Sequence, residues 1–323
     1  MRQAGLGAAK ISRARELKGV WLLASWTEEY VSVMSDATLL EGFRSLFTEF
    51  RGARLRYFAA GAGRPVVLVH GLGGAATNWT RLAPLLARSR RVLVPDLPGH
   101  GRSGSIGRHA DLGAYADCIV AILEQETTAP VALVGHSMGG VVALRLAVAH
   151  PARVSALALV GSAGISSTSR RAEAFLALTG LLRPARHAAR LRHHIAPRSS
   201  LRALTFGYWG AGLARDLTAE AVLGFLEGGR DATDVAAASA ALVRDDPRLD
   251  LDRVACPALV VWGSRDRMVP LDDGFEYARR LRAPIRVVAG AGHLLIGERP
   301  EECASILRDF LDGVGEVDEL PLE

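Results

Sequence analysis

One serine lies inside a short glycine-flanked motif that is typical of a nucleophile. The motif Gly-His-Ser-Met-Gly occupies 135–139, with Ser137 at its centre, between an apolar run at 131–134 and a helix-like run at 141–150. In this strand–turn–helix context the turn is so tight that side chains at 135 and 139 would clash, so glycine is needed at both positions. The turn would lift the Ser137 hydroxyl above the carboxyl edge of a sheet, where it can attack a carbonyl carbon.

A serine hydroxyl needs a base, and a carboxylate that orients the base, to become a nucleophile at neutral pH. Asp266 follows an apolar run at 258–262, and His293 follows one at 285–288. The carboxyl ends of parallel strands meet at one edge of a sheet, so we expect Ser137, Asp266 and His293 to lie together as nucleophile, acid and base. Asp272 and Asp273 begin a predicted helix and fit better as partners of its dipole.

Acyl transfer also needs N–H donors for the negative charge that develops on the substrate oxygen. A His-Gly-Leu-Gly-Gly loop at 70–74 follows the apolar run at 66–69. We assign the backbone N–H groups of Leu72 and Met138 to the oxyanion hole. Gly71 is expected at the substrate, because glycine lets the backbone approach closely. His70 is expected to fix the loop rather than to react.

Neither the other histidines nor the three cysteines indicate metal or redox chemistry. His187, His193 and His194 have no carboxylate or cysteine arranged with them for a metal. The cysteines are far apart and lack CxxC spacing, which fits a reducing compartment and predicts a cytoplasmic location. We therefore expect no metal and no cofactor.

Six apolar runs predict the strands of a doubly wound, mostly parallel α/β sheet. They lie at 66–69, 91–94, 131–134, 156–160, 258–262 and 285–288, after a predicted antiparallel hairpin near 47–59. The stretch between 160 and 258 is helix-rich and has no strand-like run, so we predict an inserted helical cap at 164–247. The remaining core would then comprise 46–163 and 248–315.

Residues 1–45 are predicted to form a helical N-terminal extension. Its apolar patch at 20–24 is too short for a signal peptide or a transmembrane segment. An amphipathic helix on a membrane surface, a plain helical extension and a translation start at Met34 all remain open.

The net charge of +5 does not predict a nucleic-acid partner. Only Lys10 and Lys18 among the 39 basic residues are lysines, a bias that fits genome composition. The sequence also has no basic stripe interleaved with stacking aromatic residues. An arginine-rich run at 183–202 could face an anionic substrate or interface, but a solvated helix face is favoured. Phe206, Tyr208 and Trp209 are candidates for an apolar acyl pocket, with core packing as the alternative.

The stretch from 46 to 311 resembles the α/β-hydrolase superfamily, of the capped bacterial serine hydrolase type (carboxylesterase or lipase-like). Besides the two motifs above, the matching segments are 95–103 (PDLPGHGRS), 263–270 (GSRDRMVP) and 290–293 (GAGH), the last followed by 298–301 (ERPE). The resemblance implies hydrolysis of a small-molecule carboxylic ester through an acyl-serine intermediate, without a cofactor. It leaves the natural substrate and the oligomeric state open.

The superfamily hosts other activities, so alternatives must be weighed at the site. Ser137 argues against epoxide hydrolases and haloalkane dehalogenases, which use an aspartate nucleophile. Carbon–carbon bond hydrolases of the meta-cleavage type usually have a tryptophan after the histidine and a Gly-Pro-Gly loop, where this chain has Leu294 and Gly73-Gly74. Related acyltransferase domains usually follow a lipoyl domain, which we do not find. A non-catalytic ligand-binding member is disfavoured, because such proteins usually lose part of the triad.

Overall fold

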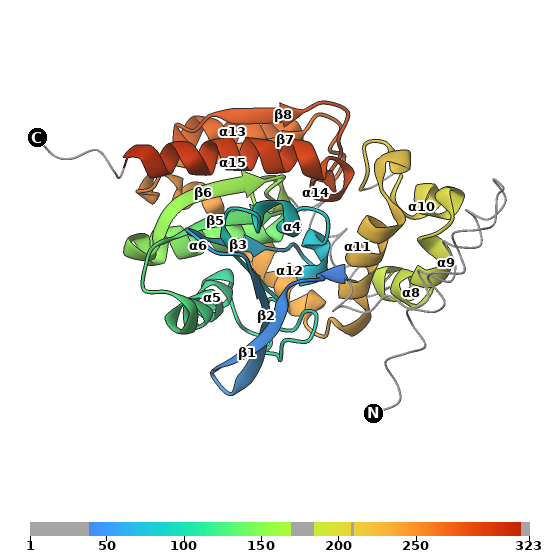
Figure 1. Ribbon diagram of the computed structural model, residues 1–323, viewed down its shortest axis with the longest axis horizontal. Helices are drawn as coiled ribbons and strands as arrows, with labels where there is room; N and C mark the ends of the chain where they lie inside the picture. The colour runs from blue at the N-terminus through green and yellow to red at the C-terminus, as the bar shows by residue number, and fades with distance from the viewer. Residues whose placement is uncertain (1–38, 169–183, 208–209, 318–323) are drawn as a thin grey trace, which may run out of the picture.

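The computed structural model describes residues 39–168, 184–207 and 210–317. Within them the chain forms an eight-stranded sheet in the order β1-β2-β4-β3-β5-β6-β7-β8 (Figure 1). Strands β1 and β2 pair with each other, and β2 with β4, in antiparallel fashion, whereas all later pairs are parallel. The bounds are β1 Arg44–Phe50, β2 Ala53–Ala60, β3 Pro65–Val69, β4 Arg91–Pro95, β5 Val131–His136, β6 Val154–Val160, β7 Ala258–Gly263 and β8 Ile285–Val288. The predicted mostly parallel α/β sheet is confirmed.

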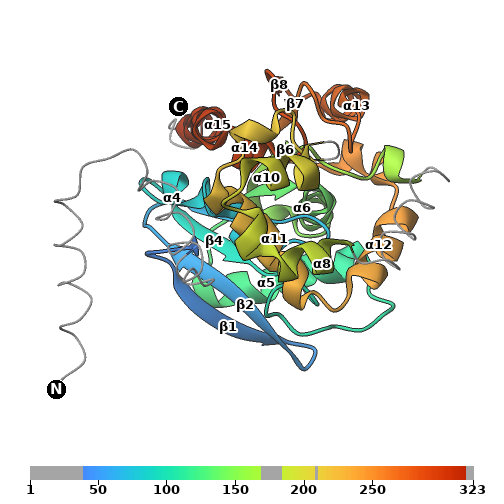
Figure 2. The same ribbon diagram turned by 90° about the vertical axis from the view of Figure 1, so that its right-hand side faces the viewer.

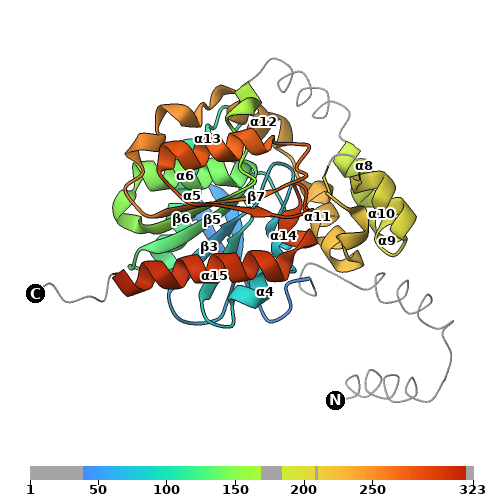
Figure 3. The same cartoon turned by 90° about the horizontal axis from the view of Figure 1, so that it is seen from above.

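Helices cover both faces of the sheet, which explains why the central strands are apolar throughout. One face packs on α5 (Leu112–Glu126), α6 (Met138–Ala149) and α13 (Leu271–Leu281). The other packs on α4 (Ala83–Leu86), α14 (Leu295–Glu298) and α15 (Pro300–Val317). Figures 2 and 3 show α4 and α15 on one side of the sheet and α6 and α13 on the other. The sheet is thus the middle layer of three.

We call residues 164–247, which lie between β6 and β7, the β6–β7 segment. Its last helix packs into the core cluster with α5 and α6, whereas the helices before it share an apolar cluster of their own. The α-helices among its described residues are α8 (Pro184–Arg190), α9 (Arg192–Ile195), α10 (Ser199–Phe206), α11 (Ala219–Asp231) and α12 (Val235–Arg244). Helix α11 lies against the core, where Thr77 Oγ1 donates to the Gly224 carbonyl at 2.8 Å. The division into core, cap and N-terminal extension stays a prediction, and residues 1–38 lie outside the described residues.

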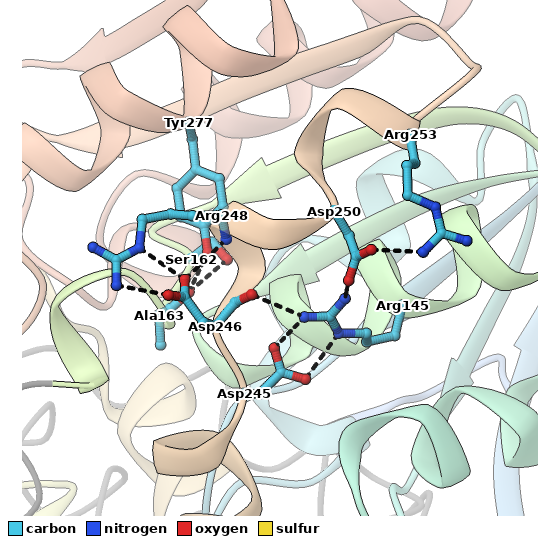
Figure 4. Close-up of polar contacts among 9 residues, drawn as sticks. All are labelled: Arg145, Ser162, Ala163, Asp245, Asp246, Arg248, Asp250, Arg253 and Tyr277. Carbon is cyan, nitrogen blue, oxygen red and sulfur yellow. Dashed lines mark hydrogen bonds and ion pairs between the residues drawn. The ribbon is translucent and has the colours of Figure 1, made fainter.

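Where the β6–β7 segment returns to the sheet, an ion-pair network joins it to α6 (Figure 4). Arg145 of α6 donates to both carboxylate oxygens of Asp245, at 2.8 and 2.5 Å, and also to Asp250. Asp250 pairs in turn with Arg253 at 2.6 Å. The Arg145 side chain is only 16% exposed, so the network is largely shielded from solvent. It fixes the returning chain to the helix that begins directly after Ser137.

Replacing Arg145 with alanine is expected to lower the free energy of unfolding by about 2–4 kcal/mol, since the partly buried Asp245 loses the cation that pairs with it and Asp250 keeps only Arg253. Urea unfolding would measure the change. Arg253→Ala is the matched control, because the Arg253 side chain is 64% exposed and exposed ion pairs contribute about 1 kcal/mol or less. Equal losses in the free energy of unfolding of the two variants would show that the ion pairs of Arg145 do not stabilise the fold as described.

Candidate active site

Ser137 occupies the turn between β5 and α6 in a backbone conformation that is unusual for a non-glycine residue. Its φ is +56° and its ψ −124°, so the side chain is held at a sharp strand-to-helix turn. A Cβ on Gly135 would lie 2.3 Å from the Gly139 carbonyl oxygen, and one on Gly139 would lie 2.3 Å from the Val69 oxygen. No side chain fits at either position, in agreement with the steric argument from the sequence.

The structure brings Ser137, His293 and Asp266 into one hydrogen-bonded chain. The Nε2 atom of His293 lies 3.0 Å from Ser137 Oγ, and its Nδ1 atom lies 2.8 Å from Asp266 Oδ2. The other oxygen, Asp266 Oδ1, accepts the N–H groups of Met268 and Val269 at 2.9 and 2.8 Å. A neutral imidazole fits this arrangement with Nδ1–H donating to Asp266 and Nε2 accepting from the serine hydroxyl.

The chain around Ser137 is held from the next loop of the sheet. The Ser137 N–H donates to the Val160 carbonyl at 3.1 Å, and the Ala163 N–H donates to the Ser137 carbonyl at 3.1 Å. The Tyr277 hydroxyl from α13 donates to the Ala163 carbonyl at 2.6 Å (Figure 4). The end of β6 and the loop after it therefore hold both backbone polar groups of Ser137, and Tyr277 holds that loop.

The loop at 70–74 lies directly against Ser137. A Cβ on Gly71 would be 2.9 Å from Ser137 Cβ and 3.4 Å from its Oγ. The His70 ring accepts the Leu97 N–H at Nε2 (2.9 Å) and donates from Nδ1 to the Gly71 carbonyl (2.8 Å). Burial lowers the pKa of His70 to about 3, so the ring holds this loop as a neutral group.

The two predicted oxyanion donors, Leu72 and Met138, follow the two residues Gly71 and Ser137 that lie in contact. Met138 is the first residue of α6, so its N–H has no acceptor within the helix. Leu72 follows Gly71 in the loop that contacts Ser137. Their role in binding an oxyanion stays a prediction.

His136 also belongs to the site, although nothing in the sequence points to it beyond its place next to Ser137. Its Nε2–H donates to the His293 carbonyl at 2.8 Å, and the two ring centroids are 4.9 Å apart. Burial lowers the pKa of His136 to about 3, so it stays a neutral donor. His136 therefore holds the backbone of His293.

Of the three aromatic residues assigned to an acyl pocket, only Phe206 is described, and Tyr208 and Trp209 lie outside the described residues. Phe206 is partly buried in the apolar cluster of the β6–β7 segment, with its ring centroid 6.5 Å from that of Phe225. Leu294, the residue after His293, packs on the same cluster. This cluster therefore reaches the loop that carries His293, while contact of Phe206 with substrate stays a prediction.

The buried histidines predict a loss of stability in acid. Burial lowers the pKa of His70 and of His136 to about 3 and lowers that of His100, whereas the unfolded chain binds these protons near pH 6.5. The stability they contribute is present above pH 6.5 and is lost as the pH falls toward 3. Urea unfolding should therefore give a smaller free energy at pH 5 than at pH 7.5. His136→Gln should flatten this dependence and His109→Gln, at an exposed position, should not; equal midpoints at both pH values in the wild type would contradict the prediction.

The described residues hold no group of three or more His, Cys, Asp or Glu side chains placed to bind a metal ion. Among the described helices, none is both long and apolar enough to cross a bilayer.

Comparison with known proteins decides the family. The model of the alpha/beta hydrolase family matches residues 66–306, which is most of the chain. The chain belongs to the alpha/beta hydrolase family. Ser137, Asp266 and His293 all lie within the matched range.

Its relatives within the alpha/beta hydrolase family differ in activity. The chain is 35% identical over 270 residues to the dihydrolipoyllysine-residue acetyltransferase component of the acetoin cleaving system of Pseudomonas putida, covering 81% of this chain and 68% of that one. It is 32% identical over 263 residues to pimeloyl-[acyl-carrier protein] methyl ester esterase of Aromatoleum aromaticum, covering 77% and 98%. It is 42% identical over 122 residues to 2-hydroxymuconate semialdehyde hydrolase of Pseudomonas sp. (strain CF600), covering 36% and 42%.

Proposed function

We propose that this alpha/beta hydrolase cleaves carboxylic esters of small molecules through an acyl-serine intermediate. The observation that carries the proposal is the hydrogen-bonded chain from Ser137 Oγ through His293 to Asp266, at 3.0 and 2.8 Å. A hydroxyl at a strained turn, a base within hydrogen-bond reach and a carboxylate behind the base are the parts that acyl transfer needs. The esterase relative, which the chain matches over 98% of its length, supports the same chemistry.

In the proposed reaction His293 Nε2 takes the hydroxyl proton while Ser137 Oγ attacks the ester carbonyl. Asp266 holds the imidazole tautomer and stabilises the cation that forms. The N–H groups of Leu72 and Met138 bind the oxyanion. The alcohol then leaves with the proton held by His293, and water repeats the two steps on the acyl-serine.

The substrate would enter beside Gly71, where the absence of a side chain leaves room next to Oγ. We assign the acyl pocket to Phe206, Tyr208 and Trp209 of the β6–β7 segment. The proposed triad supplies the nucleophile, the base and the acid, and the two backbone N–H groups bind the oxyanion. The reaction as proposed therefore uses no cofactor.

Hydrolysis of p-nitrophenyl esters of increasing acyl-chain length would test the proposal. We expect turnover by the wild type, with a chain-length optimum set by the pocket, and covalent labelling of Ser137 by a fluorophosphonate in the native but not the unfolded protein. A folded wild type that turns over no ester of the series and takes no label would overturn the proposal.

Carbon–carbon bond hydrolysis is the second candidate, since the chain is 42% identical over 122 residues to a 2-hydroxymuconate semialdehyde hydrolase. The same Ser137 and His293 would serve such a reaction. Turnover of a ring-cleavage product together with inactivity on esters would favour it.

The acetyltransferase relative raises a third outcome, in which a thiol rather than water accepts the acyl group. Adding a dithiol to the ester assay and analysing the products for thioester separates transfer from hydrolysis. Free acid as the product at all dithiol concentrations would support the hydrolase.

A further inference from the structure

Both neighbours of His293 are linked to the β6–β7 segment, Leu294 by a direct hydrogen bond and Gly292 through the carboxylate of Glu298. The Leu294 N–H donates to the Gly210 carbonyl at 3.1 Å. The Gly292 N–H lies 3.1 Å from each carboxylate oxygen of Glu298, and Glu298 Oε2 also accepts the Gly212 N–H at 2.8 Å. The carboxylate of Glu298 therefore bridges the loop that carries His293 and a loop of the β6–β7 segment.

The two loops pack backbone against backbone. A Cβ on Gly212 would lie 2.1 Å from the Gly290 carbonyl oxygen, and a Cβ on Gly292 would lie 2.3 Å from the Gly212 nitrogen. No side chain separates the two segments there. A displacement of one loop must therefore displace the other.

Burial disfavours the ionised form of the Glu298 side chain. The residue is 4% exposed, and burial raises the pKa of Glu298. A buried carboxylate stays ionised where hydrogen bonds to it offset the hydration that it has lost. Here the N–H groups of Gly212, Leu213 and Gly292 do so, and a buried acceptor with that set of donors fixes the spacing of the two loops.

The geometry assigns Glu298 as a positioning residue for the base. It links the loop at 210–213 to the loop that carries His293, so that this loop of the β6–β7 segment and the imidazole act as one body. The assignment rests on the proposed function, because it gives the proposed base its orientation. Misplacing a reacting group by about 1 Å can cost on the order of 10²-fold in rate, so the link should act on kcat.

The test compares Glu298→Ala, Glu298→Gln and Glu301→Gln on the best ester of the series. Active sites are counted by titration with a fluorophosphonate that is allowed to react to completion. The kinetic constants are expressed per titrated site, so unfolded protein does not count toward them. We expect Glu298→Ala to lower kcat by about 10–100-fold with KM within twofold. Glu298→Gln keeps an acceptor oxygen and should recover part of the loss.

Glu301→Gln is the matched control, because Glu301 is close in sequence and its side chain is 69% exposed in a pair with Arg81. Its kcat should equal that of the wild type. If Glu298→Ala does not fold, Gly212→Ala separates the same loops without changing Glu298 and should show the same loss of kcat. Unchanged kcat per titrated site in the Glu298 variants, with only a lower melting temperature, would overturn the assignment. Absence of ester turnover in the wild type would instead overturn the proposed function.

Discussion

A Ser137→Ala variant is expected to lose about 10⁴- to 10⁶-fold in kcat/KM toward any ester that the wild type hydrolyses. Its Oγ is the only atom removed, and that atom lies 3.0 Å from His293 Nε2. Without it, water must attack the carbonyl directly, and only the oxyanion donors and substrate binding remain to lower the barrier. Initial rates at high enzyme concentration, on freshly purified protein, would measure the residual activity.

The variant should keep its fold, because the backbone bonds of Ser137 to Val160 and Ala163 do not involve the side chain. Circular dichroism and the melting temperature would check this. Ser105→Ala, at an exposed serine, controls for the substitution itself and should be fully active. A Ser137→Ala enzyme with more than a few per cent of wild-type activity would place the nucleophile elsewhere.

An Asp266→Asn variant is expected to lose about 10³- to 10⁴-fold in kcat. Two backbone N–H groups, from Met268 and Val269, donate to Asp266 Oδ1. The amide oxygen of asparagine must take that place, which turns its NH₂ group toward His293 Nδ1. The imidazole then has to accept at Nδ1 and carry its hydrogen on Nε2, where it can no longer take the serine proton.

Asp272→Asn is the matched control for this variant, since it makes the same chemical change at an exposed position of α13 and should leave kcat unchanged. Steady-state kinetics on the same ester would compare the two. Comparable kcat in Asp266→Asn and the wild type would show that another carboxylate orients the base.

Much of the fold could be predicted from the sequence because local patterns determine it. Apolar runs bounded by glycine and proline mark the central strands, and the motif at 135–139 is readable because one turn geometry requires its glycines. Strand β8 differs from the central strands because part of it is exposed to solvent. It lies at the edge of the sheet, where Arg286 and Val287 are exposed, although its sequence suggested a strand buried on both faces.

The groups that support the site could not be predicted, because their roles depend on contacts between distant parts of the chain. Glu298 meets Gly212, which is 86 positions away, and His136 meets His293, which is 157 positions away. Neither contact leaves a periodic or compositional trace. Tyr277 likewise reads as an ordinary aromatic residue of a helix until its hydroxyl is seen on the Ala163 carbonyl.

The position of the β6–β7 segment divides the proposed catalytic triad between two parts of the chain. Ser137 precedes it, whereas Asp266 and His293 follow it, and the two parts meet where β6 pairs with β7. During synthesis on the ribosome, the part that carries Ser137 emerges before the part that carries its proposed base. Cleaved within the segment, the protein would regain the proposed hydrolysis only when the two fragments reassociate along that strand pair, which is the property that a split reporter needs.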